Sequence, residues 1–142
     1  RLNAALSDGR ALDVFARLIA AQGGDPGVCD DPLRLPQPVG THPVTATRSG
    51  VVTRVATREI GLLAIELGCG RAKKDDVVDP ASGFRIRKKS GDSVAAGEPL
   101  LVVELGPTAR PNATFYERLG ACFEIQDERE TAELLPFVVG RL

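Results

Sequence analysis

The segment Gly68–Lys74 concentrates residue types that could contact an anionic ligand such as a phosphate group. Its two glycines permit close approach of the backbone, and three cationic side chains follow within four residues. Backbone N–H, guanidinium and ammonium groups are the usual partners of phosphate oxygens in proteins. The candidate contacts are Gly68, Gly70, Arg71, Lys73 and Lys74.

A purely structural interpretation of the same segment stays open. Gly68 would end a helix, and Gly70 would permit a turn after it. The cations would be solvated or would pair with Asp75 and Asp76, as most surface charges are.

Other reactive side chains lack the partners that catalysis or metal binding needs. Cys69 has no recognisable base near it, so we interpret it as a small packing residue. The only histidine, His42, has no cysteine or carboxylate at ligand spacing and is expected at the surface. Lys88 and Lys89 are adjacent, so alternation along a strand would point them to opposite faces. We therefore predict no catalytic residue and no metal site in this chain.

Composition narrows the class of protein. Of the 142 residues 43% are hydrophobic, enough for a real core. A net charge of −1, with no Trp and one Tyr, disfavours nucleic-acid binding. The three cysteines are far apart and lack CxxC spacing, which favours a reducing, cytoplasmic location over a disulfide framework. No apolar run approaches ~18 residues, so we expect no membrane association.

Three segments are expected to position these residues. Residues 10–22 predict an amphipathic helix, because apolar side chains recur at helical spacing and a Gly-Gly pair follows. Before it, residues 2–6 are expected to form a turn. The proline-rich residues 26–39 predict a semi-rigid linker and a domain boundary. Residues 40–142 predict a mixed domain of helices and strands.

The mixed domain is expected to begin with a hairpin, in which residues 44–47 pair with residues 51–55 across a Ser-Gly turn. Thr57 is the expected N-cap of the next helix, and Gly68 is its expected end. The remaining expected elements are a helix at 113–121 and strands at 122–125 and 137–139.

Residues 85–104 carry the most informative local pattern. Two faces alternate over residues 84–89, the period of a half-buried strand. One face carries Phe84, Ile86 and Lys88, and the other carries Arg85, Arg87 and Lys89. A Gly-Asp-x-Val-x-x-Gly corner from Gly91 to Gly97 then predicts two tight turns, and residues 100–103 predict a buried strand. Two short strands around such a corner predict an α+β, hammerhead-like mixed β domain related to the barrel-sandwich folds.

Three stretches, in this order, resemble the C-terminal third of the thymidine and pyrimidine-nucleoside phosphorylases. The first begins at Asp8-Gly9-Arg10-Ala11 and ends at Gly23-Gly24-Asp25; the second contains Ser49-Gly50-Val51-Val52 and Leu67-Gly68-Cys69-Gly70-Arg71. The third extends from Gly83-Phe84 through Lys88-Lys89-Ser90-Gly91-Asp92 to Gly97. Each motif alone is weak, but the ordered set is specific and covers nearly the whole chain.

The resemblance implies a dimeric enzyme that cleaves a pyrimidine nucleoside with inorganic phosphate as co-substrate and without another cofactor. It implies that residues 1–25 are the last helical segment of the family's large α/β domain. The family's phosphate and pyrimidine sites would lie outside this chain, which begins at Arg1, so we expect an inactive fragment that dimerises through missing regions. We further expect the Gly68–Asp76 loop to lie at the mouth of the interdomain cleft.

Two other classes of protein are alternatives. Biotinyl and lipoyl carriers share the corner at 91–97, but their modified lysine lies in the hairpin that follows, and no lysine occurs after Lys89. A non-catalytic assembly module is the other alternative, because an apolar helical stripe at residues 12–19 would favour self-association if it were uncovered.

Overall fold

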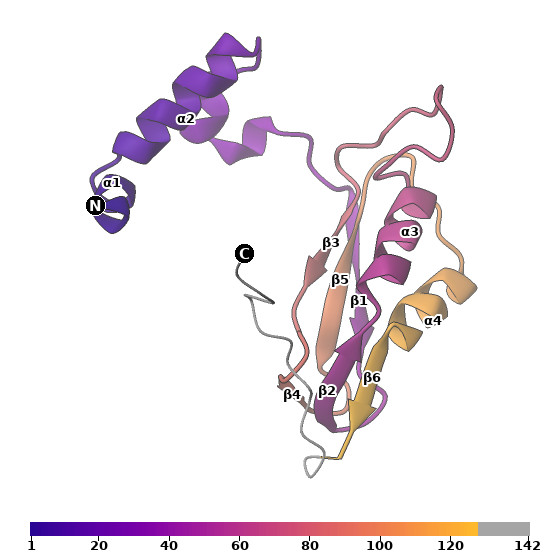
Figure 1. Ribbon diagram of the computed structural model, residues 1–142. Helices are drawn as coiled ribbons and strands as arrows, with labels where there is room; N and C mark the ends of the chain where they lie inside the picture. The colour runs from indigo at the N-terminus through magenta and orange to yellow at the C-terminus, as the bar shows by residue number, and fades with distance from the viewer. Residues whose placement is uncertain (128–142) are drawn as a thin grey trace, which may run out of the picture. The chain divides into compact units, whose positions relative to one another are not determined.

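The computed structural model describes residues 1–127 and divides the chain into two compact units, Arg1–Gln37 and Pro38–Leu142 (Figure 1). The strand expected at 137–139 lies outside the described residues. Each unit is described by itself below.

The first unit is helical. It contains α1 (Leu2–Ser7) and α2 (Arg10–Ala21), followed by two 3₁₀ helices, η1 (Pro26–Cys29) and η2 (Pro32–Arg34). The helix expected at 10–22 is confirmed, whereas the turn expected at 2–6 is wrong because that segment forms α1.

The proline-rich segment is more regular than a simple linker. Each 3₁₀ helix begins with an Asp-Pro pair, and the aspartate side chain accepts a hydrogen bond from the second N–H beyond it. These bonds join Asp25 to Gly27 (2.9 Å) and Asp31 to Leu33 (3.1 Å). Proline at the first helical position and aspartate before it are favourable start signals, which explains the local order.

In its described part, up to residue 127, the second unit contains two three-stranded antiparallel sheets and two helices, which confirms the α+β class (Figure 1). One sheet has the order β1-β5-β3, and the other has the order β4-β2-β6. The strands are β1 (Gly40–Thr45), β2 (Gly50–Val55), β3 (Gly83–Ile86), β4 (Ser93–Val94), β5 (Pro99–Leu105) and β6 (Phe123–Gln126). The helices are α3 (Thr57–Leu67) and α4 (Ala113–Ala121).

The hairpin expected between residues 44–47 and 51–55 is wrong. β1 pairs with β5, and β2 pairs with β4 and β6, so the Ser-Gly step carries the chain from one sheet to the other. The physical reason is that later strands take the partners: β5 pairs with β1, and β4 and β6 flank β2 on its two sides. At Gly50 the backbone of β6 comes so close that a Cβ atom would overlap the carbonyl oxygen of Gln126.

The corner expected at 91–97 is confirmed. Gly91 and Gly97 have φ of 92° and 82°, in the left-handed region that favours glycine, and Val94 between them is buried. β3 and β5 pair on either side of the corner. β3 ends at Ile86, before the expected residue 89, because the next two N–H groups both donate to the carbonyl of Leu100 and interrupt the ladder.

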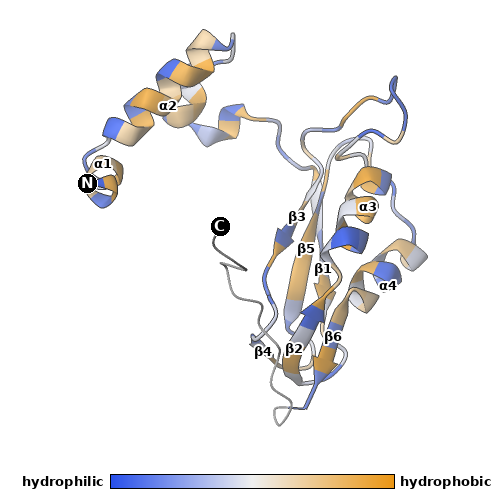
Figure 2. Cartoon of the chain, viewed as in Figure 1, coloured by the Kyte–Doolittle hydropathy of each residue, from blue (hydrophilic) through white to orange (hydrophobic). Residues whose placement is uncertain are grey.

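The core joins both sheets and both helices. β5 is largely hydrophobic, as Figure 2 shows, and supplies three of the six large side chains that are fully buried among residues 1–127. The six are Val52, Leu63, Leu100, Leu101, Val103 and Leu119.

The helix ends follow the local capping rules in part. Gly68 ends α3 with φ of 106°, as expected, but the N-cap of α3 is Ala56 and not Thr57, which is the first helical residue. Asn112 is the N-cap of α4, and its side chain accepts a hydrogen bond from the N–H of Phe115 at 3.0 Å.

Candidate functional site

The basic loop, which we define as Cys69–Val78, connects α3 to the segment before β3. At its start, the N–H of Cys69 donates to the carbonyl of Ala64 (2.9 Å). At its end, the N–H of Asp79 donates to the carbonyl of Gly68 (2.8 Å). The two ends of the loop are therefore joined directly, and the loop projects from a closed base.

The cationic side chains of the basic loop are exposed. Arg71, Lys73 and Lys74 take part in none of the ion pairs formed within residues 1–127. Figure 2 shows the tip of the loop as hydrophilic. These cations are thus available to an anion. Four of the five candidate residues lie on the basic loop, and the fifth, Gly68, ends α3 directly before it.

The carboxylate of Asp76 holds the interior of the basic loop. It accepts hydrogen bonds from the backbone N–H groups of Ala72 (3.0 Å) and Lys73 (2.8 Å). The structural interpretation is therefore confirmed for Gly68, which ends α3. For Asp76 the structure shows bonds to the loop backbone in place of an ion pair with a neighbouring cation.

Sequence reasoning missed Asp79, the only charged side chain that is buried among the described residues, at 9% exposure. Its carboxylate accepts hydrogen bonds from the Thr108 hydroxyl (2.8 Å) and the Ala81 N–H (3.0 Å). The bond to the residue two positions ahead is an Asx turn, which the Asp-Pro pair could have indicated. Its partner Thr108, 29 residues away, has no local signal.

These bonds lower the pKa of Asp79, with the Thr108 hydroxyl as the largest cause, against the raising effect of burial. The ionised carboxyl is therefore favoured in the folded state. Its stabilising contribution is present above the ordinary carboxyl pKa and is lost as the pH falls through the lowered pKa.

Cys69 is a poor nucleophile in this structure. Burial raises the pKa of its thiol, and the negative charge of Asp79 adds to the effect, so the thiol stays protonated at neutral pH. His42 is exposed, as expected, and stacks on the ring of Tyr116 in α4 with centroids 3.9 Å apart.

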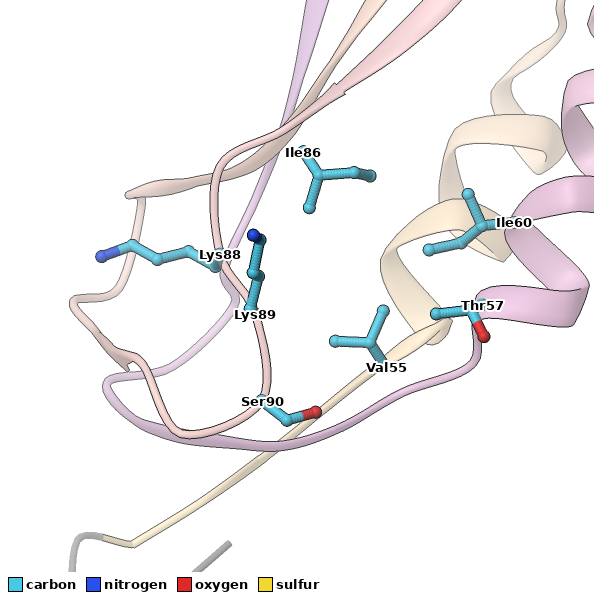
Figure 3. A pocket seen from close by; sticks show the side chains of 7 residues that line it. All are labelled: Val55, Thr57, Ile60, Ile86, Lys88, Lys89 and Ser90. Atoms are coloured by element: carbon cyan, nitrogen blue, oxygen red, sulfur yellow. The ribbon is translucent and has the colours of Figure 1, made fainter. Parts of the chain in front are cut away.

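A hollow of about 420 Å³ lies between the start of α3 and the corner after β3 (Figure 3). Its walls are aliphatic, with Ile60 and Ile86 facing each other above Val55. Lys88 points away from the hollow, where its Nζ pairs with Glu98 (2.6 Å), while the side chain of Lys89 lies along the rim. Recognition of a nucleoside needs several converging polar groups, which this hollow lacks.

No group of three or more potential metal ligands occurs among residues 1–127. No helix in this range is long and apolar enough to cross a membrane.

Comparison with known proteins gives a consistent result. Residues 51–104 match the family described as the pyrimidine nucleoside phosphorylase C-terminal domain. The pyrimidine-nucleoside phosphorylase of Bacillus subtilis is 43% identical over 103 residues, which is 72% of this chain and 24% of that protein. That of Geobacillus stearothermophilus is 42% identical over 102 residues, with the same shares of both chains.

The thymidine phosphorylase of Agrobacterium fabrum is 37% identical over 126 residues, which is 88% of this chain and 28% of that protein. The chain thus spans about a quarter of the length of the curated relatives that it matches. It belongs to the pyrimidine-nucleoside and thymidine phosphorylase family, of which it carries the C-terminal domain.

Proposed function

We propose that this chain is the C-terminal part of an enzyme that cleaves the N-glycosidic bond of pyrimidine nucleosides with inorganic phosphate. The products are the free base and a pentose 1-phosphate. The observation that carries the proposal is the match of residues 51–104 to the C-terminal domain of this family, together with relatives named as phosphorylases. The chain alone is inactive in this account.

The two units have different roles in the proposed enzyme. Residues 1–25 belong to the large α/β domain, residues 26–39 are the linker, and residues 40–142 form the hammerhead-like C-terminal domain. Support for the first assignment comes from α2, whose residues Leu12, Phe15 and Leu18 are each about half exposed. An apolar stripe of this kind suits a helix that packs on a sheet supplied by the rest of the enzyme.

The basic loop lies at the mouth of the cleft between the domains and becomes ordered against the substrate when they close. The exposed cations of Arg71, Lys73 and Lys74 support this role, because they are not occupied by neighbouring carboxylates within the described residues. Closure would exclude water, so that phosphate and not water attacks the anomeric carbon. Inorganic phosphate is the co-substrate, and the chain contributes no covalent nucleophile.

The assembly and location of the enzyme are part of the same proposal. A homodimer forms through regions outside this chain, in the cytoplasm, without nucleic acid or membrane. Sedimentation of the complete protein should give the mass of two subunits; a monomer would contradict this point.

Phosphate dependence tests the proposed reaction. The complete protein that contains this chain should release uracil or thymine from uridine or thymidine only when inorganic phosphate is present, as followed by ultraviolet absorbance. The 142-residue chain alone is the matched control and should release none. Base release that is independent of phosphate would contradict a phosphorylase.

The carrier alternative makes a different prediction. A biotinyl or lipoyl domain needs a lysine in the hairpin after β5, and the chain has no lysine after Lys89. The intact mass of the chain produced in cells should therefore equal the mass of the unmodified sequence. An added mass that matches biotin or lipoate would favour the carrier class.

A further inference from the structure

We propose that Asp79 is the positioning residue of the basic loop: its buried carboxylate clamps the closing end of the loop to the segment after β5 and so sets where Arg71 is held. The positioning role rests on the proposed function. The clamp itself rests on the contacts of Asp79 and is independent of the reaction.

The carboxylate joins segments that are distant in sequence. One oxygen, Oδ1, accepts from the N–H of Ala81, and the other, Oδ2, accepts from the hydroxyl of Thr108. The first bond shapes the turn after the basic loop, and the second ties that turn to the segment that follows β5.

Space for this carboxylate depends on Gly106. A Cβ atom at Gly106 would overlap both carboxylate oxygens of Asp79, so the glycine allows the approach. The N–H of Gly106 also donates to the Ser82 hydroxyl (2.9 Å), a second bond between the same two segments. The clamp is therefore a built contact between the turn and the end of a core strand.

The same residue closes the base of the loop through its backbone. Its N–H donates to the carbonyl of Gly68, the residue that ends α3. The loop carrying Arg71 therefore starts at a helix that is packed into the core and ends at a residue anchored by its side chain. A loop held at both ends in this way has fewer conformations open to it, so less ordering remains to be completed when the domains close on the substrate.

Two substitutions at Asp79 separate the effect of its side-chain hydrogen bonds from the effect of its negative charge. Asp79→Ala removes both side-chain bonds and leaves the buried N–H of Ala81 without its partner. Asp79→Asn can keep both, because its Oδ1 accepts from Ala81 and its amide donates to the hydroxyl of Thr108, which can also accept. Thr108→Val is an independent variant that removes only the bond to the segment after β5.

Hydrogen exchange on the 142-residue chain tests the clamp without any activity. Asp79→Ala should speed exchange of the loop amides at 72 and 73 by about tenfold, while Asp79→Asn should change it less than about threefold. Any change in the exchange rate of the β5 amides should be the same in all variants. Asp92→Ala is the matched control, since this carboxylate accepts from the N–H of Lys89 (2.7 Å) in a turn outside the loop. Wild-type exchange of the loop in both Asp79→Ala and Thr108→Val would overturn the clamp, whether or not the complete protein is a phosphorylase.

Kinetics of the complete enzyme test the positioning role. If Asp79 acts through Arg71, the double variant Asp79→Ala/Arg71→Ala should lose no more kcat/KM than the worse single variant, because coupled residues are not additive. Losses that multiply would show an unrelated structural effect and overturn the positioning role. Absence of phosphorolysis in the wild type would overturn the proposed function and, with it, the positioning role.

Discussion

Replacing Arg71 with alanine in the complete enzyme should lower kcat/KM for the nucleoside by about tenfold or more, while the melting temperature stays unchanged. A charge-assisted hydrogen bond to a phosphate or other anionic group contributes about 1.5–3 kcal/mol, and each 1.4 kcal/mol corresponds to about a factor of ten. The guanidinium of Arg71 is exposed and unpaired within the described residues, so its removal should cost the fold little.

Arg87 offers a matched control for this experiment. It is another exposed arginine that forms no ion pair within residues 1–127, and it lies at the corner after β3, outside the basic loop. Arg87→Ala should keep wild-type kinetics. Wild-type kinetics in Arg71→Ala as well would show that the loop does not reach the reacting substrate.

The largest effect on stability should come from Leu101→Ala, with a loss of about 2–5 kcal/mol in the free energy of unfolding. Leu101 is fully buried in β5, the central strand of its sheet, where it pairs with Val44 on one side and Ile86 on the other. Alanine would leave a cavity in the hydrophobic core cluster to which the Leu101 side chain belongs, and urea denaturation would report the loss.

Val77→Ala is the comparison for the core substitution, because both changes shorten an aliphatic side chain. Val77 is 91% exposed in the basic loop, so the change should stay within about 0.5 kcal/mol of wild type. A loss below about 1 kcal/mol for Leu101→Ala would mean that the strand order around β5 is not the one described.

Local signals in the sequence correctly predicted the features that depend on local backbone geometry, namely a helix end and two turns. Gly68 ends α3, and Gly91 and Gly97 turn the corner, because only glycine adopts these backbone conformations without strain. The alternation before the corner and the apolar run after it predicted β3 and β5, which pair on either side of the corner. A turn and its two flanking strands form a unit that a short stretch of sequence can specify.

Local signals did not predict which of the strands that are distant in sequence pair with each other. Residues 44–55 have the pattern of a hairpin, yet β1 and β2 belong to different sheets because β5 and β6, much later in the chain, take their edges. Strand pairing depends on which apolar faces the whole domain can bury together, and this is a property of the assembled core.

The candidate site also contains residues that the local sequence predicts and residues whose contacts only the folded chain forms. The cations of the basic loop could be identified from their spacing, because residue type alone gives them their chemistry. The anchor of the loop could not, since Asp79 acts through Thr108 and Gly106, which only the folded chain brings to it. A buried carboxylate is thus the part of the site that sequence reading is least able to find.

Identification of the sugar product tests the central claim most directly. The complete protein, incubated with thymidine or uridine and inorganic phosphate, should form a pentose 1-phosphate in step with the free base, with a new ³¹P resonance growing as inorganic phosphate is consumed. Base released together with free pentose, while the inorganic phosphate resonance stays constant, would identify a hydrolase and contradict the account.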